Sequence, residues 1–464
     1  MTIIPQDILD EQAVNSTVSN FLSTFKVGSA LRKSGAYKEK GIGVMTLFNY
    51  LLCLIFSGRS MYMDMLTGSF KESFSKNSVY RLLNNSKIHW KKFTTLISAQ
   101  IINAFMKPLT DDKRNDVFII DDSLFEKNRS KKTELLSNVF DHCSMTYKRG
   151  FRLLTLGWSD GNSFIPVNSC LLASSKTDNR YCDAQKFDKR SIAGKRRKQA
   201  QCKATDVMLD LLDSAKAAGL SAKYVLFDSW FSSPIAIQKI KNRGFDTIAM
   251  VKKSSKITYA FEGERLNIKQ IYSRCKKRRG RSKYLLSVTV MVGKEDPKEG
   301  LVSIPAKLVC VRNKSKKKDW LVLISTDTRL TEEEIIQIYG KRWDIEVFFK
   351  VCKSYLKLSK ECRSISYDAL TAHTAIVFVR YMLLSVEKRT NEDDRSIGEL
   401  FYRITDELAD LTFSASFSII MQALMDTMIE MFHISEDEMK KFMENFIGKL
   451  PKYLQSALIP SISA

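Results

Sequence analysis

The sequence predicts an α/β protein whose central sheet is flanked by helical regions at both ends of the chain. Three observations predict this class. Apolar runs typical of strands alternate with amphipathic segments between residues 111 and 251. Residues 1–110 show the three-to-four spacing of helices, and residues 386–464 are Met-rich with a helical pattern. At 464 residues, the chain is long enough for roughly two to four domains.

The expected sheet begins with three strands and continues with alternating helices and strands. Asp160-Gly161-Asn162 is a hairpin turn signal between the second and third strands, so we expect the first three strands to form a meander. The expected strands are residues 116–120, 151–158, 164–172, 223–227 and 245–251, and the expected helices between them are residues 203–218 and 234–243.

Residues 252–325 interrupt this alternation with short β-rich runs separated by basic and Gly/Pro turns, which predicts a β-rich insertion subdomain. Residues 326–385 would then complete the core that residues 111–251 begin. The N-terminal region contains a stretch, residues 74–93, with the texture of a helix-turn-helix. Its basic side chains either meet DNA phosphates or form the solvated face of a helical bundle: Arg81, Lys87, Lys91 and Lys92.

The chain is strongly basic, with 74 Lys and Arg against 51 Asp and Glu and a net charge of +23. Three segments that we interpret as loops carry most of this surplus: residues 184–203, residues 269–283 and residues 312–318. A surplus of this size favours nucleic acid as the partner, with an anionic membrane surface as the competing interpretation. The candidate contacts in these segments are Arg196, Arg197, Arg278, Arg279 and Lys317.

Several other classes of protein are excluded. The most apolar stretch, residues 45–56, has 12 residues, which is too short to span a bilayer and predicts a buried helix. Residues 1–12 lack the pattern of a secretory signal, and the nine cysteines contain no C-x-x-C pair. His142 and Cys143 are adjacent, which is unsuitable spacing for chelation. We therefore expect a cytoplasmic protein with reduced cysteines and no membrane association.

Two carboxylates lie where apolar strands are expected to end, at Asp121 and at Asp228. In an open α/β sheet, functional groups gather at the carboxyl ends of the strands. Two acids there would form a pocket suited to Mg²⁺ or Mn²⁺, although each acid could instead cap the turn or helix that follows it. Asp122 is an alternative to Asp121, because adjacent strand residues face opposite ways.

A helical segment near residue 346 places four polar residues on one face, together with Lys350: Tyr339, Arg342, Glu346 and Lys353. A break at Gly340 or Asp344 would still leave Glu346 and Lys353 on a shared face. This helix is either a surface helix with salt pairs or part of a site where cations meet phosphate. The apolar residues 347–349 favour burial and therefore the site.

The pattern Y-(2)-R-(3)-E-(6)-K, following D-x-[ST] and a second strand-terminal Asp, resembles the signature of the DDE transposases of the insertion-sequence-four family. The resemblance covers residues from about 75 to about 385. It implies an RNase H-like (retroviral integrase-like) catalytic core with a β-rich insertion. It also implies that Asp121, Asp228 and Glu346 are the catalytic acids and metal ligands. The D-x-[ST] form favours Asp121 over Asp122, because Ser123 then takes the third position.

The resemblance further implies cut-and-paste DNA transposition at terminal inverted repeats, with Mg²⁺ or Mn²⁺ as cofactor. Arg342 and Lys353 would hold phosphates, Tyr339 would orient one, and a hairpin intermediate is implied by the resemblance alone. Trp320 would stack on a flipped base or, alternatively, pack in the core. A homodimer on DNA is implied, with residues 386–464 as its interface. The alternative functions are a structure-specific nuclease and a domesticated, non-catalytic DNA-binding protein.

The basic segments predict that affinity for duplex DNA falls steeply with salt, because each neutralised phosphate releases counterions. If six or more phosphates are contacted, we expect a loss of about a thousandfold between roughly 50 and 200 mM salt. Fluorescence anisotropy with a labelled duplex measures this slope. An affinity that does not change with salt would contradict the interpretation of the charge surplus.

Overall fold

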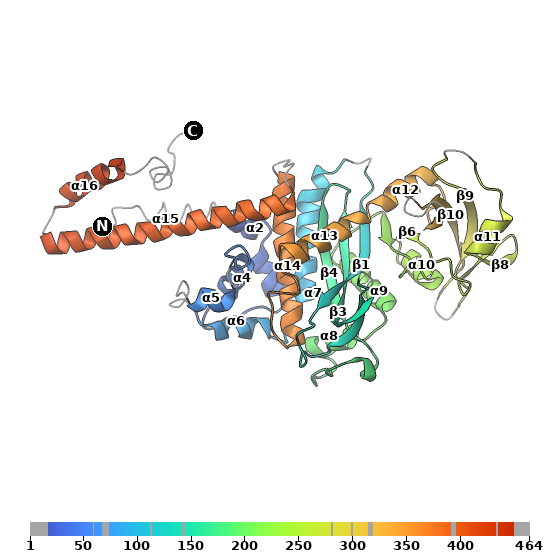
Figure 1. Cartoon of the computed structure of the whole chain (residues 1–464), viewed down its shortest axis with the longest axis horizontal. Coiled ribbons are helices and arrows are strands. Elements are labelled where there is room, and N and C mark those ends of the chain that lie inside the picture. Colours follow the sequence, from blue (N-terminus) through green and yellow to red (C-terminus); the bar gives the residue numbers. More distant parts are fainter. Residues whose placement is uncertain are drawn as a thin grey trace.

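A mixed sheet of eleven strands runs through the centre of the molecule, with helices packed on it (Figure 1). The computed structural model describes residues 17–58, 60–66, 74–111, 114–141, 144–279, 282–297, 300–313, 319–390, 396–432 and 435–449. The strand order is β2-β3-β1-β5-β6-β11-β10-β9-β7-β8, and β4 also pairs with β3. The sheet is therefore both the core of the molecule and the frame that positions its polar residues.

One half of the sheet contains the predicted meander. The strands β1, β3 and β4 pair antiparallel, and β5 and β6 then run parallel to β1. Every residue of β5 is buried, as expected of a parallel strand covered on both faces. The bounds in this half are β1 Val117–Glu126, β2 Ser137–Asp141, β3 Thr146–Ser159, β4 Phe164–Leu172, β5 Tyr224–Phe227 and β6 Asp246–Met250.

The other half of the sheet comes from residues 252–325, where the sequence predicts a β-rich insertion. These strands do not form a sheet of their own, because β11 pairs antiparallel with β6 and so extends the central sheet. The segment also contains a helix, α11 (Ile268–Arg274), that the sequence pattern did not predict. The strands here are β7 Thr258–Phe261, β8 Glu264–Asn267, β9 Leu286–Val292, β10 Ile304–Arg312 and β11 Trp320–Ser325.

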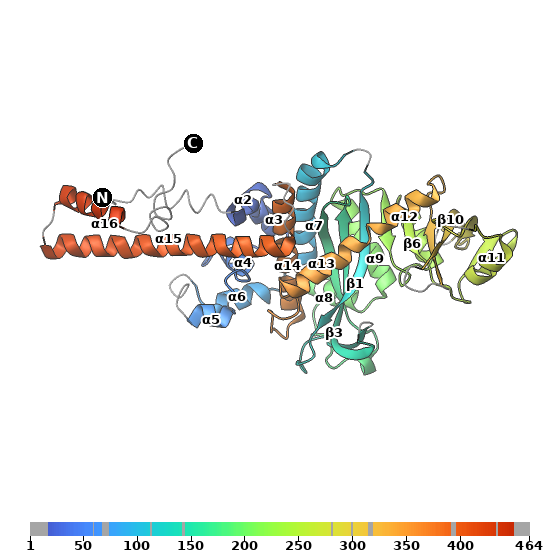
Figure 2. The ribbon, with the colours of Figure 1, turned by 45° about the horizontal axis from the view of Figure 1, so that its top comes forward.

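Helices α7 and α14 pack against β4, and α9 contacts β3 and β4 (Figure 2). The helix α14 is long and apolar enough to cross a membrane by length and composition, yet 94% of its apolar window is buried inside the protein. The helices before β1 are α2 Thr17–Thr24, α3 Val27–Lys33, α4 Val44–Cys53, α5 Met61–Leu66, α6 Lys76–Leu83 and α7 Trp90–Ile101, followed by η1 Ile102–Met106 and η2 Lys107–Leu109. The later elements are η3 Thr177–Asn179, α8 Ile192–Ala200, α9 Ala204–Ala217, α10 Pro234–Lys241, α12 Glu332–Gly340, α13 Trp343–Ser354, α14 Tyr367–Thr390, α15 Ile397–Phe432 and α16 Glu436–Lys449.

Arg380 fastens the N-terminal helices to the core. This side chain lies on α14 and is almost fully buried. It donates to the carbonyls of Leu51 and Leu52, near the end of α4, and pairs with Glu361. Carbonyls in the last turn of a helix have no partner within the helix, so a buried guanidinium satisfies them and fixes the position of α4.

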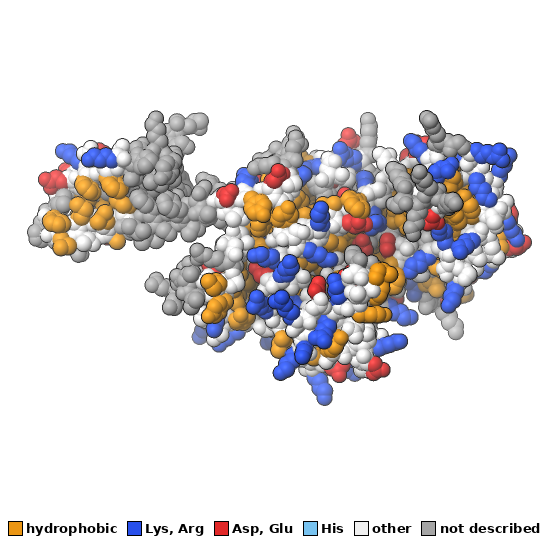
Figure 3. Space-filling view, in the orientation of Figure 1, with side chains coloured by type: hydrophobic (Ala, Val, Ile, Leu, Met, Phe, Trp, Pro, Cys, Tyr) orange, Lys and Arg blue, Asp and Glu red, His pale blue; other side chains and the backbone are white. Residues whose placement is uncertain are grey.

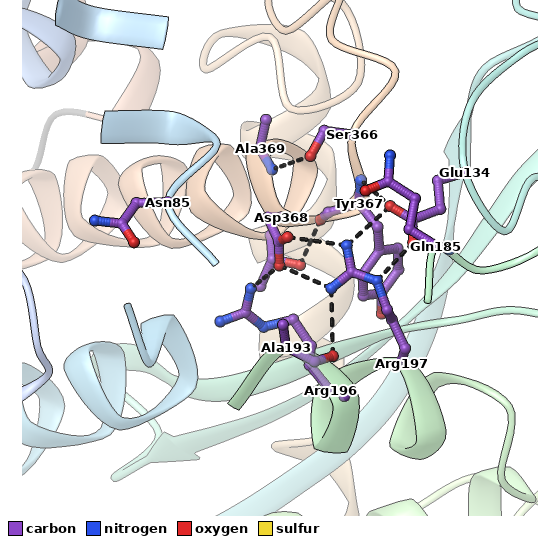
Figure 4. A network of polar contacts seen from close by, with 12 residues as sticks. Asn85, Glu134, Gln185, Ala193, Arg196, Arg197, Ser366, Tyr367, Asp368 and Ala369 are labelled. Carbon is purple, nitrogen blue, oxygen red and sulfur yellow. Dashed lines mark hydrogen bonds and ion pairs between the residues drawn. The ribbon is translucent and has the colours of Figure 1, made fainter. Parts of the chain in front are cut away.

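The first basic segment, residues 184–203, is a loop only in part, because residues 192–200 form the helix α8. Ser191 accepts a hydrogen bond from the backbone N–H of Gly194 and so begins α8. Two arginines of α8 point into the protein (Figure 4). Arg197 donates to Glu134 at 2.6 Å and to Asp368 at 2.9 Å, and Arg196 pairs with Asp368.

This arrangement does not support the prediction that Arg196 and Arg197 contact DNA. Arg197 is 3% exposed, and both guanidinium groups are committed to carboxylates. Composition alone does not tell which side chains of the run Lys195-Arg196-Arg197-Lys198 point inward. In the structure its two lysines are exposed. The two arginines hold α8 and α14 together and leave the lysines for the surface.

We expect Arg197→Met to lower the free energy of unfolding by about 3 kcal/mol, because it removes the cation that pairs with buried Glu134 and one of the two that pair with buried Asp368. Lys195→Met on the exposed face of the same helix is the matched control and should change it by less than about 0.5 kcal/mol. Urea denaturation measures both values. Equal, small effects of the two substitutions would show that the buried network does not stabilise the fold.

Candidate active site

The register of β1 and β5 brings two carboxylates to one edge of the sheet. Ile120 pairs with Phe227 in the last step of the parallel ladder, and Asp121 and Asp228 are the next residues on each strand. The sequence predicted that the first strand ends before Asp121, but β1 continues to Glu126 because β3 keeps pairing with it. Asp121 thus lies inside a strand, at the point where its parallel neighbour stops.

The third predicted acid comes from α13, which contacts β1 (Figures 1 and 2). The helical stretch divides after Gly340, one of the two expected break points, into α12 and α13. The backbone of Lys341 and Arg342 keeps right-handed helical angles, so the predicted polar face is almost continuous. Glu346 lies in the first turn of α13.

Arg342 lies between the acids. Its Nη1 is 3.3 Å from Asp121 Oδ2, and its Nη2 donates to Glu346 Oε1 at 2.5 Å. The guanidinium is also 5.8 Å from the ring centre of Tyr339, one turn earlier. One arginine therefore joins β1 to α13 and places positive charge beside two carboxylates.

The acids at this edge hold their protons more tightly than usual. Burial and the neighbouring charge of Asp228 together raise the pKa of Asp121 to about 7, while Arg342 acts in the opposite direction. Burial also raises the pKa of Asp228. Burial raises the pKa of the Tyr339 hydroxyl to about 12, so this group stays neutral and can donate a hydrogen bond at neutral pH.

Asp122, the alternative first acid, faces away from Asp121 and has a partner of its own. Arg152 on β3 donates to both of its carboxylate oxygens, at 2.6 Å and 2.5 Å. This bidentate pairing neutralises Asp122. The geometry thus separates the two adjacent acids, with Asp121 beside Arg342 and Asp122 beside Arg152.

A family model described as DDE superfamily endonuclease matches residues 48–294. The chain belongs to the DDE superfamily endonucleases. No curated protein matches the sequence. The matched region contains Asp121 and Asp228 and ends before Glu346. Membership supports nuclease or transposase activity on DNA, whereas the role of Glu346 depends on the geometry of α13 and on the sequence spacing.

In the described residues of this DDE endonuclease, no group of three or more His, Cys, Asp or Glu side chains is arranged as a metal site. Asp121 and Glu346 each contact Arg342 instead of sharing a common point. His142 and Cys143 lie outside the described residues. The eight described cysteines are free, as expected of reduced thiols.

The other predicted DNA contacts are dispersed. Lys353 is half-buried and Lys350 is exposed on α13, and Arg278 and Arg279 are exposed in the insertion. Lys317 lies outside the described residues. In the N-terminal region Arg81, Lys87 and Lys92 are exposed, whereas Lys91 is bonded to Gln199. Figure 3 shows Lys and Arg side chains spread over the visible face of the insertion and of the central body.

Trp320, the predicted base-stacking residue, already has aromatic and cationic neighbours. Its ring stacks on Tyr272 with the centres 4.0 Å apart, and the Lys253 ammonium lies 4.6 Å from the ring centre. Sequence reasoning overlooked a different tryptophan, Trp230, which is exposed two residues after Asp228. Its position in the turn that follows a strand-terminal acid was the available signal.

The raised pKa of Asp121 predicts the pH dependence of stability in the absence of metal. Its pKa lies at about 7 in the folded protein against a usual value of 3.8, so between these values the folded state binds more protons than the unfolded state. The contribution of Asp121 to the free energy of unfolding is therefore at its maximum below about pH 4 and is lost as the pH rises through about 7. We expect Asp121→Asn to exceed the wild type in free energy of unfolding at pH 8, and the difference to vanish near pH 4.

Urea denaturation in EDTA at both pH values measures this difference. Asp122→Asn is the matched control, because Arg152 already compensates Asp122, and it should not gain stability at pH 8. An Asp121→Asn variant that is less stable than the wild type at pH 8 would show that Asp121 is held as a favourable ion pair.

Proposed function

We propose that this DDE endonuclease is a transposase that resembles the insertion-sequence-four family and that cleaves and rejoins DNA at terminal inverted repeats. The observation that carries the proposal is the placement of Asp121 and Asp228 at the same end of the parallel ladder of β1 and β5, with Arg342 joining Asp121 to Glu346 of α13. The antiparallel strands β1, β3 and β4 with the parallel strands β5 and β6 support an RNase H-like core. The segment between β6 and α12 supports the predicted insertion.

The donor chemistry suits a divalent cation. Three carboxylates supply hard oxygen ligands. Burial and the neighbouring charge of Asp228 raise the pKa of Asp121, so a second cation besides Arg342 would be stabilising there. Asp121, Asp228 and Glu346 would hold Mg²⁺ or Mn²⁺. Such ions lower the pKa of an attacking water and stabilise a leaving oxygen in phosphoryl transfer.

The surrounding side chains would position the DNA backbone. Arg342 is the nearest cation to the acids and can pair with a phosphate as it now pairs with carboxylates. The neutral Tyr339 hydroxyl beside it can donate to a phosphate oxygen. Lys353 and Lys350 extend positive charge along α13. Attack by water then breaks the bond to the 3′-oxygen, and the released 3′-hydroxyl attacks a second strand.

Three finer features remain part of the proposal. Attack of the released 3′-hydroxyl on the opposite strand would give a hairpin. A base that stacks on Trp320 would have to fit beside Tyr272 and Lys253. Dimerisation through the C-terminal region is supported by α15, which projects from the body (Figure 1) and exposes Leu424, Met431 and Phe432. The alternatives are a structure-specific nuclease and a non-catalytic DNA-binding protein.

Cleavage of a duplex that carries the inverted repeats flanking the gene tests the proposal. With Mg²⁺ we expect wild-type protein to leave 3′-hydroxyl ends and to join them to a target plasmid. Asp121→Asn, Asp228→Asn and Glu346→Gln should each reduce cleavage by about a hundredfold or more, because each removes a metal ligand. Chelation by EDTA should abolish it.

Asp122→Asn is the matched control and should retain cleavage. Cleavage without joining would favour the structure-specific nuclease, and tight binding without cleavage would favour the non-catalytic protein. Full activity of Glu346→Gln, or loss of activity in Asp122→Asn but not in Asp121→Asn, would overturn the assignment of the acids.

A further inference from the structure

The turn after β5 fixes an aromatic side chain next to the acids. Asp228 Oδ1 accepts a hydrogen bond of 2.8 Å from the backbone N–H of Trp230. The next residue, Phe231, is fully buried and anchors the turn in the core. The same four-residue turn therefore sets the position of the Asp228 carboxylate and directs the Trp230 indole to the surface.

Two cations from other elements lie against this indole. The Arg152 guanidinium, from β3, is 5.1 Å from the ring centre, and the Lys252 ammonium, just after β6, is 4.2 Å from it. Both distances are in the range of cation–π attraction. Burial raises the pKa of Asp228 and the charge of Lys252 acts against it, so this ammonium lies near the acid as well as the indole.

Trp230 nevertheless remains 48% exposed with both cations in place. A large aromatic ring that is rigidly placed, accessible and flanked by positive charge has the features of a site for single-stranded nucleic acid, in which bases stack and phosphates meet cations. The turn does not need Trp230 to hold it in place, because the buried Phe231 already anchors it. Core packing therefore does not explain a large aromatic side chain at this position.

We propose that Trp230 stacks on a nucleobase of the DNA strand that enters the site, with Lys252 beside the adjoining phosphate. The inference rests on the proposed function for its location, since the base would lie next to the bond that is cut. Stacking accepts any base, so Trp230 would contribute affinity and positioning and no sequence preference.

The test compares two labelled probes in Ca²⁺ by fluorescence anisotropy with the full-length protein. One probe is a twelve-nucleotide thymidine strand, and the other is a twelve-unit abasic strand with the same phosphates and no bases. We expect Trp230→Ala to bind the thymidine strand about tenfold more weakly and the abasic strand as the wild type does. Trp230→Phe should bind both strands within about twofold of the wild type, because a smaller ring still stacks.

Two further variants sharpen the comparison. Lys252→Ala should weaken both probes, because it removes a phosphate contact. Tyr147→Ala is the matched control, since Tyr147 is an even more exposed aromatic residue on β3, eight positions from the strand partner of Asp121. It should change the affinity for neither probe.

Equal weakening of both probes by Trp230→Ala, or no weakening of either, would overturn the proposal. Thermal unfolding identifies a fold defect in Trp230→Ala, and in that case Trp230→Phe provides the test. A loss of affinity for the thymidine strand in Trp230→Phe as large as that in Trp230→Ala would also contradict stacking. Base-dependent binding together with a wild type that does not cleave DNA would reject the proposed function and leave the stacking site in place.

Discussion

The parallel pairing of β1 with β5 is the constraint on which the candidate site depends. Because Ile120 and Phe227 end the ladder together, the residues that follow them, Asp121 and Asp228, are forced to the same edge of the sheet. Burial of two carboxylates at one place is unfavourable, and the raised pKa of both acids reflects it. The site therefore requires positive charge, and the rest of the structure supplies it.

Arginines supply that charge at close range. Arg342 joins Asp121 to Glu346, and Arg152 pairs with Asp122 and neutralises it. Elsewhere Arg197 and Arg380 join helices to the core. The surplus of +23 is thus not a uniform DNA-binding surface. Part of the arginine content is internal, and exposed lysines and the arginines of the insertion remain for a polyanionic partner.

Elements with strong local signals could be predicted from the sequence, and elements set by pairing could not. The prediction of β4 at residues 164–172 is confirmed residue for residue, and α9 and α10 begin and end within two residues of their expected bounds. The continuation of β1 beyond Asp121 depends on β3, which no local pattern reveals. The same applies to β2 and to the inward direction of Arg197, which depends on Glu134 and Asp368.

For the candidate site, spacing gave Tyr339, Arg342, Glu346 and Lys353 a common face, and the structure keeps that face through the break after Gly340. Trp230 was missed because a single tryptophan in a turn has no periodic signal. Its surroundings come from β3 and from the end of β6, far away in the sequence.

The central claim is that the edge formed by β1 and β5 binds a divalent cation. Anomalous diffraction from crystals of the wild type soaked in Mn²⁺ tests it most directly. We expect a manganese peak about 2.1 Å from carboxylate oxygens of both Asp121 and Asp228. Well-ordered carboxylates without a manganese peak, and with Arg342 still between Asp121 and Glu346, would contradict it.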